Sequence, residues 1–143
     1  MKLKWLVAAA AVVILVGSMW FLLRTNRIDD DKAKAVASWL HSVRLKPGLN
    51  ANVKLPAQFN DLAASGSVDV MLSQNNKLAY FLRTKKGFKG NYQGYIYVES
   101  GYPFIITNDS YGRSTIDIFS DGNSSVIDKK ISNNVYAVFF DLN

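Results

Sequence analysis

The most constraining feature of the sequence is an apolar run close to its start. Residues 5–23 contain no charged side chain and are bounded by Lys2 and Lys4 on one side and by Arg24 on the other. As a helix, these 19 residues extend about 28 Å, close to the ~30 Å hydrocarbon core of a bilayer. We therefore predict a membrane anchor over residues 1–24, with residues 5–23 in contact with the lipid bilayer.

Two other interpretations of this segment stay open. A cleaved signal peptide would have the same basic start, and Gly17 and Ser18 are the small residues that a cleavage site needs. Against cleavage, the apolar run continues through residues 19–23, and Trp5 and Trp20 lie near its ends, as interfacial residues do. The third interpretation is a buried helix of a soluble domain, which the length of the run disfavours. We expect a retained anchor, with secretion after signal cleavage as the alternative.

The basic residues on the two sides of the run give conflicting indications of orientation. Lys2, Lys4 and the amino terminus precede it, and four basic residues follow within positions 24–34. The charge rule alone would place the carboxy-terminal part inside. A short basic head followed directly by an apolar run is, however, how signal-anchors begin, and moving two lysines and an amine across a bilayer is unfavourable. We expect a single-pass protein of the cytoplasmic membrane with its carboxy-terminal domain outside the cytoplasm.

Residues 25–143 have the composition of a single ordinary globular domain. They carry 14 of the 17 basic side chains and all 11 acidic ones, so half of the formal net charge of +6 belongs to residues 1–24. Nucleic acid is therefore not an expected partner. The chain has no cysteine and one histidine, which excludes a disulfide framework, a thiolate metal site and any site with two histidine ligands. We predict neither a metal nor a cofactor.

The segment after the anchor predicts an amphipathic helix. Its apolar residues recur at intervals of three and four, as on one face of a helix: Ala33, Val36, Ala37, Leu40 and Val43. The aspartates at 29–31 can cap its start, and Pro47 and Gly48 end it. His41 lies beside this apolar stripe with no carboxylate or second ligand nearby in sequence, which indicates a surface residue.

After a short second helix with Pro56 at its first position, the apolar period changes to that of strands. Seven apolar or β-branched runs are separated by polar breaks, most of them containing glycine or asparagine: 68–72, 78–84, 92–98, 104–107, 114–119, 125–131 and 135–140. Short breaks without helices predict antiparallel pairing. The predicted domain is therefore α+β, with both helices packed on an antiparallel β-meander of about six or seven strands.

Two of these strands are apolar on both faces. Every position of 135–140 is nonpolar, and 95–98 is nearly so. Such strands are either central and covered on both sides, or they carry aromatic surface that is exposed for a partner. The amphipathic helix is the natural cover for one face of the sheet, and the sequence does not name the cover of the other.

The candidate binding residues form a basic run followed by tyrosines. They are Arg83, Lys85, Lys86, Lys89, Tyr92, Tyr95, Tyr97 and Tyr102. Cations and stacking faces of this kind hold phosphate-bearing or sugar-containing polymers. The alternative is a lysine-rich hairpin tip followed by tyrosines that are present because tyrosine favours strands. We expect this region to contact an envelope polymer or a membrane protein partner, if the domain binds one.

The carboxylates give little indication of catalysis. Five aspartates are scattered over predicted turns and strands: Asp109, Asp117, Asp121, Asp128 and Asp141. Nothing selects from them a pair with the separation that glycoside hydrolysis needs. The serines lack a Gly-x-Ser-x-Gly context, and His41 is the only histidine available as a base. We predict no catalytic residues and keep a small aspartate-dependent hydrolase as an alternative.

The order of elements, an apolar helix, an amphipathic helix and then an antiparallel sheet, resembles the outline of type IV pilins and pseudopilins. That family has a glutamate early in its apolar segment, whereas the first glutamate here is Glu99 and the run opens as Trp5-Leu6-Val7-Ala8. The resemblance is one of architecture and covers no motif. The expected function is a single-pass anchored protein that presents a small binding or structural domain, with a pilin-like or envelope-assembly subunit as an alternative.

Overall fold

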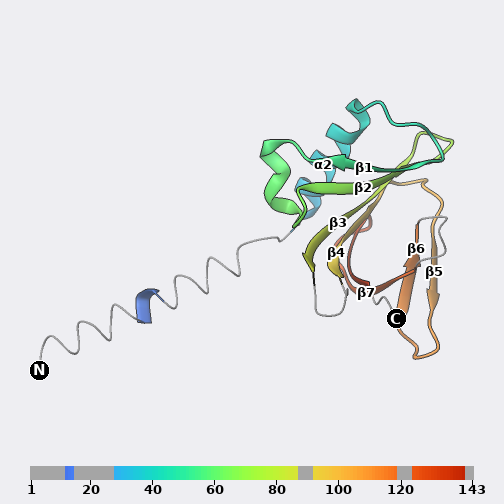
Figure 1. Ribbon diagram of the computed structural model, residues 1–143. Helices are drawn as coiled ribbons and strands as arrows, with labels where there is room; N and C mark the ends of the chain where they lie inside the picture. The colour runs from blue at the N-terminus through green and yellow to red at the C-terminus, as the bar shows by residue number, and fades with distance from the viewer. Residues whose placement is uncertain (1–11, 15–27, 87–91, 119–123, 141–143) are drawn as a thin grey trace, which may run out of the picture.

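The computed structural model describes residues 12–14, 28–86, 92–118 and 124–140. Within these ranges a helical region precedes an antiparallel sheet of eight strands, so the predicted α+β class is confirmed (Figure 1). No helix in this described part is long and apolar enough to cross a membrane. Of the predicted anchor, only residues 12–14 are described, as a helical turn, and the anchor stays a prediction.

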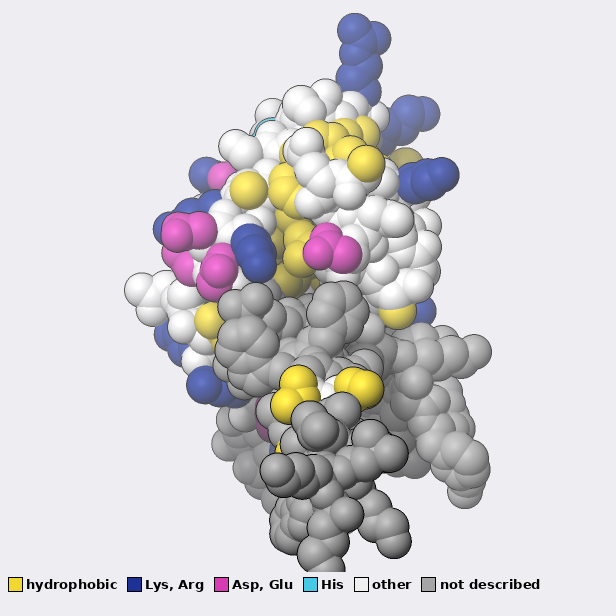
Figure 2. Space-filling model, turned by 90° about the vertical axis from the view of Figure 1, so that its left-hand side faces the viewer, with side chains coloured by type: hydrophobic (Ala, Val, Ile, Leu, Met, Phe, Trp, Pro, Cys, Tyr) yellow, Lys and Arg dark blue, Asp and Glu magenta, His cyan; other side chains and the backbone are white. Residues whose placement is uncertain are grey.

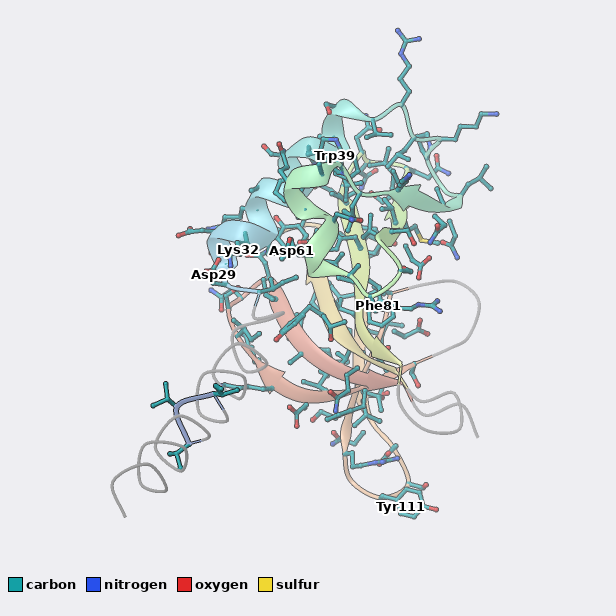
Figure 3. The ribbon with its side chains drawn as sticks, turned by 60° about the vertical axis from the view of Figure 1, so that its left-hand side comes forward. Asp29, Lys32, Trp39, Asp61, Phe81 and Tyr111 are labelled. Atoms are coloured by element: carbon teal, nitrogen blue, oxygen red, sulfur yellow. The ribbon has the colours of Figure 1, made fainter. Side chains whose placement is uncertain are left out.

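Helix α2 (Asp30–Ser42) confirms the predicted amphipathic helix. Asp29 caps it, because its side chain accepts a hydrogen bond of 2.8 Å from the backbone N–H of Lys32. Figure 3 shows both residues at the start of α2 and Trp39 toward its end. The helix buries four residues of the predicted stripe: Ala33, Val36, Ala37 and Leu40.

The eight strands are β1 (Asn50–Lys54), β2 (Ser67–Leu72), β3 (Leu78–Lys86), β4 (Tyr92–Val98), β5 (Ile105–Asn108), β6 (Ser114–Asp117), β7 (Ser125–Lys130) and β8 (Val135–Phe140). Seven of them lie where the sequence predicts them. The additional strand, β1, has a largely polar sequence at one edge of the sheet, where burial imposes no apolar alternation.

The predicted antiparallel meander is confirmed only in part, because the strands do not follow one another in a single sequential order across the whole sheet. The strand order is β1-β2-β3-β4-β8-β7-β6-β5, so two four-stranded meanders join along β4 and β8. Since these two strands are the ones with two apolar faces, they occupy the centre of the sheet, and the chain crosses from β4 to the far edge before it returns. The predicted second helix is a 3-10 helix, η1 (Ala57–Leu62), with Pro56 in the capping position before it.

Each face of the sheet has its own core. The helix-side core packs α2 and η1 against alternate residues of β3, namely Leu78, Tyr80 and Leu82. Figure 2 shows a strip of hydrophobic side chains, flanked by acidic and basic ones, on the outside of this layer. The sheet-side core lies on the opposite face and contains the intervening residues Ala79 and Phe81.

The second face of the sheet is covered by another part of the same sheet, which curls over it. Ile116 and Ile118, in and just after β6, are buried in the sheet-side core with Phe81 and Ile96. Figure 1 shows β6 and β5 standing on the side of β4 that is turned away from α2. The curled sheet therefore encloses one core and supports the helix on its other side.

Polar contacts fix α2 along its length. The hydroxyl of the buried Tyr80 donates to the backbone oxygen of Ala33 at 2.9 Å. Near the end of the helix, Nε2 of His41 lies 3.2 Å from Oε2 of Glu99, which also accepts a hydrogen bond from the backbone N–H of Leu78 at 2.8 Å. His41 is on the surface as expected, but a carboxylate from 58 positions away contacts it.

The curl of the sheet depends on two bulges and one glycine. The pairing register shifts between Arg83 and Lys85 in β3 and between Ile127 and Lys129 in β7. Such bulges bend a sheet. Beside the first bulge, Gly94 is packed so closely that a Cβ atom there would lie 2.2 Å from the backbone oxygen of Leu82 and 2.5 Å from the Phe81 ring.

We predict that Gly94→Ala lowers the free energy of unfolding by about 1–3 kcal/mol, because backbone and ring cannot both move away from the added methyl group. The matched control is Gly112→Asn, at an exposed turn glycine with φ of 76° and nothing within 4 Å, where asparagine tolerates the backbone conformation. Thermal unfolding followed by circular dichroism measures both. Equal unfolding temperatures for the two variants would contradict the prediction.

Candidate functional site

The basic run that the sequence selects is only partly described. Arg83 is exposed at the end of the regular part of β3, and its Nη2 lies 2.9 Å from Oδ2 of Asp69. Its guanidinium also lies 5.6 Å from the centre of the Phe81 ring. The side chain therefore already has an anionic and an aromatic neighbour within the domain.

Lys85, Lys86 and Tyr92 lie at one end of the paired strands β3 and β4. Lys85 and Lys86 belong to β3, and the backbone of Lys86 pairs with that of Tyr92 in β4. The side chains of these three residues, and all of Lys89, lie outside the described part of the chain. Their binding role stays a prediction.

The other three tyrosines are divided between the two cores. Tyr95 is half-buried against the helix-side core, and Tyr97 is buried there with its ring stacked 5.1 Å from that of Tyr80. Tyr102 is buried in the sheet-side core, where its hydroxyl donates to the backbone oxygen of Ile118 at 3.0 Å. These rings therefore do not form one exposed stacking surface.

Burial also sets the ionisation of these phenols. It raises the pKa of Tyr97, with the charge of Glu99 as a further cause. Burial, together with the charge of Asp117, raises the pKa of Tyr102 to about 12. Both hydroxyls therefore stay protonated at neutral pH, as the hydrogen bond that the Tyr102 hydroxyl donates requires.

The exposed apolar surface lies elsewhere, on what we call the β5–β6 arm: residues 104–117, which comprise β5, β6 and the turn between them. All four residues of β5 are exposed, and Ile105 reaches an exposed fraction of 62%. Phe104 and Ile106 are also large exposed hydrophobic residues. An apolar strand on the outside of a sheet is typical of a contact surface.

The β5 edge is short, but its residues include none of the charges, prolines or bulges that protect many edge strands. Natural edges carry charged residues, prolines or bulges that block pairing with another chain. The opposite edge, β1, is polar, contains Lys54, and uses the Asn52 side chain to donate to Asp69 at 2.8 Å. By contrast, Ile105–Asn108 contains no charge and no proline, and its register with β6 is regular.

Half of the backbone groups of β5 point away from β6. The backbone N–H of Asp109 donates to the oxygen of Arg113 at 2.9 Å, so these two residues form a hydrogen-bonded pair of the hairpin. Because such pairs alternate along an antiparallel ladder, the N–H and C=O groups of Ile106 and Asn108 point outward. In the described part of the chain β5 is the last strand of the sheet, so no strand pairs with these groups.

The tip of the arm presents an aromatic ring on an ordered turn. The carboxylate of Asp109 accepts hydrogen bonds from the backbone N–H groups of Tyr111 and Arg113 at 2.9 and 2.8 Å, and from Arg113 Nε at 2.6 Å. The Arg113 guanidinium lies 5.4 Å from the centre of the Tyr111 ring, which is 83% exposed. Figure 3 shows Tyr111 at the far end of the arm, distant from α2.

Sequence reasoning passed over this site, because residues 108–112 have the composition of an ordinary turn. The available signals were an uncharged, β-branched run at 105–107 and an aromatic residue, Tyr111, in the break that follows. Neither signal shows that the strand lies at the edge of the sheet. In the described part of the chain β5 is an edge strand because β6 is its one neighbour, and the sequence does not reveal this pairing.

Three of the eight described aspartates form ion pairs: Asp30 with Lys34, Asp69 with Arg83, and Asp109 with Arg113. Hydrogen bonds from Lys34 and Ser132 lower the pKa of Asp30. A general acid needs a raised pKa, so this carboxylate does not support hydrolase chemistry. Among the described residues, no group of three or more histidines, aspartates or glutamates could hold a metal ion.

A shallow depression of about 160 Å³ lies where the two bulges meet. Thr84, Tyr95, Asp128 and Phe139 are among its lining residues, so it offers one carboxylate beside mostly uncharged side chains. This volume holds a few water molecules and is below the range typical of small-molecule sites.

Comparison with protein-family models, with curated proteins and with solved structures finds no match for this chain.

We predict that the tip of the arm keeps its structure well into acid. Burial acts to raise the pKa of Asp109, but the hydrogen bonds and charge of Arg113 outweigh it and hold the pKa below its usual value of 3.8. Because the folded pKa is lowered, the stabilisation is present above the usual carboxyl pKa and is lost as pH falls through the folded value. Amide resonances of Tyr111 and Arg113 should shift with a midpoint below 3.8, and Asp109→Asn should abolish that titration. A midpoint above 3.8 would refute the prediction.

Proposed function

We propose that the protein is a membrane-tethered binding module that contacts another protein chain through the β5–β6 arm. The observation that carries this proposal is the uncharged edge strand β5, in which all four residues are exposed. An exposed edge binds an extended chain through main-chain hydrogen bonds, and the alternating side chains give specificity. On β5, Ile105 and Ile106 supply apolar contacts on the two faces of such an added strand.

The tip of the arm supports the same role. Tyrosine provides a large contact area at a low entropic cost, and aromatic and arginine side chains dominate the energetics of many interfaces. The hydrogen bonds of Asp109 hold the backbone of Tyr111 and Arg113 before any partner binds. A preorganised turn loses less conformational entropy on binding than a loose one.

The tether follows from the apolar segment at residues 5–23 and from the position of Ile28. Ile28 is buried in the helix-side core, and the chain between position 23 and Ile28 reaches at most about 18 Å. In this proposal the domain therefore sits directly on the outer surface of the cytoplasmic membrane. Its partner is a protein of the same membrane or of the adjacent envelope.

The membrane part of the proposal predicts that the full-length protein stays in the membrane pellet after an alkaline carbonate wash. Val13→Arg places a charge near the middle of the apolar segment and should move much of the protein to the supernatant, because a central arginine costs about 2.5–3.5 kcal/mol. Val13→Leu is the matched control and should stay in the pellet. Recovery of the unaltered protein in the supernatant would refute the tether.

The binding part is tested by a photo-crosslinking amino acid introduced at Tyr111 or at Ile105 of the full-length protein in its native membranes. We expect adducts of higher mass at both positions, identified by mass spectrometry, and none from the exposed Gln58 of η1. Asp109→Ala should reduce the Tyr111 adduct several-fold, because the turn loses three hydrogen bonds. Equal adducts at all three positions, or adducts at none, would refute a contact surface on the arm.

A further inference from the structure

The outer edge of β5 is chemically suited to pair with itself. Residues 104–108 carry no charge, and the outward backbone groups of alternate residues offer both donors and acceptors. An edge of this kind is completed by another extended backbone, and a second copy of the same edge supplies the complementary groups.

We propose that two copies of this chain pair through β5, antiparallel, about a two-fold axis at Ile106. This inference rests on the proposed binding role of the β5–β6 arm and names its partner as a second copy. In a two-fold pairing the same residues contribute from both sides. Ile106 then faces Ile106 of the second copy, Ile105 faces its Thr107, and Phe104 faces its Asn108.

This register uses every outward backbone group of the strand. Ile106 of one copy pairs with Ile106 of the other. On either side of this pair, Phe104 of one copy pairs with Asn108 of the other. Each of the three pairs contributes two backbone hydrogen bonds, so about six form between the copies. If the two-fold axis moved from Ile106 to Phe104, the outward backbone N–H and C=O groups of Asn108 would have no partner in the β5 strand of the other copy. The complete pairing therefore selects the axis at Ile106.

The side chains of β5 suit this arrangement. Ile105 and Ile106 are 62% and 46% exposed, and they lie on opposite faces of the strand, so the added strand reduces solvent contact on both faces. The Thr107 hydroxyl lies 3.0 Å from that of Thr115 and is satisfied within its own hairpin. It therefore needs no polar partner across the interface.

The β1 edge is less suited to the same role. A head-to-tail contact, with β5 of one copy on β1 of the next, would form a ring or an open filament and not a two-fold pair. It would bring Lys54 beside the apolar β5 and leave the Asn52 side chain bonded within its own sheet. Charge and hydrogen bonding therefore favour the closed two-fold pair.

The membrane tether assists this pairing. A strand of four residues provides only a small interface, which is weak between freely diffusing molecules. Two anchored copies are confined to one layer, and confinement raises their effective concentration without any new contact. We therefore expect the pair to form between copies that are anchored in the same membrane.

The absence of cysteine makes the test direct, since a single introduced thiol reports on a single contact. In the full-length protein in membranes, Ile106→Cys should give a disulfide-linked dimer on mild oxidation, because directly opposed residues have Cα atoms about 5.5 Å apart, within disulfide range. Tyr111→Cys is the control, because it is more exposed but lies off the two-fold axis.

Two further variants test the register. Differently tagged Ile105→Cys and Thr107→Cys chains, when mixed in one membrane, should form the mixed dimer in preference to either homodimer. Adding Ile106→Lys to both should abolish the mixed dimer, because like charges meet directly across the axis. Ile106 is partly exposed, so this change leaves the fold intact, as circular dichroism would verify.

The proposal is overturned if Ile106→Cys dimerises no more than Tyr111→Cys. Crosslinking of Ile106→Cys to Asn52→Cys would also overturn it, in favour of head-to-tail assembly. If Ile106→Cys stays monomeric while the photo-crosslinker at Ile105 captures a different protein, the pairing of two copies is refuted and the proposed binding role of the arm is supported. If neither probe reacts, both proposals fail.

Discussion

The pairing of β4 with β8 is the contact on which the rest of the domain depends. Each strand belongs to a different meander, and their register, with Tyr95 opposite Ala137 and Ile96 opposite Tyr136, joins the two halves into one sheet. Both strands send apolar side chains to both faces. The sheet must therefore be covered twice, and the described helices α2 and η1 contribute residues to only one of the two cores.

The two covers are built differently. On one face α2 packs with small and branched residues, and the buried hydroxyl of Tyr80 bonds to the helix backbone at Ala33. On the other face the sheet curls over itself, which requires the bulges and the close approach of Phe81 to Gly94. The curl carries β5 beyond the reach of α2. An exposed edge at this end thus follows from the way the second core is closed.

The sequence predicts much of this fold, because burial imposes periodicity on α2 and on seven of the strands. It does not predict β1, since an edge strand with little burial carries no alternation. It also does not predict the strand order, which depends on pairing between residues far apart in the chain. The candidate site shows the same limit. A tyrosine ring can be buried, as in Tyr97 of β4 and in Tyr102, or exposed, as in Tyr111 of the β5–β6 turn, and only the tertiary structure distinguishes these cases.

The position of β8 has a consequence for how the domain is made. The central strand β4 receives its second neighbour only from β8, and 36 residues separate the two strands in the chain. During synthesis β1 to β4 emerge first, with the apolar edge of β4 still open. Such an edge is prone to aggregation until its partner arrives. Because β8 emerges last, this edge of β4 stays open until the rest of the sheet has been synthesised, and during that interval a chaperone would find an apolar strand to bind.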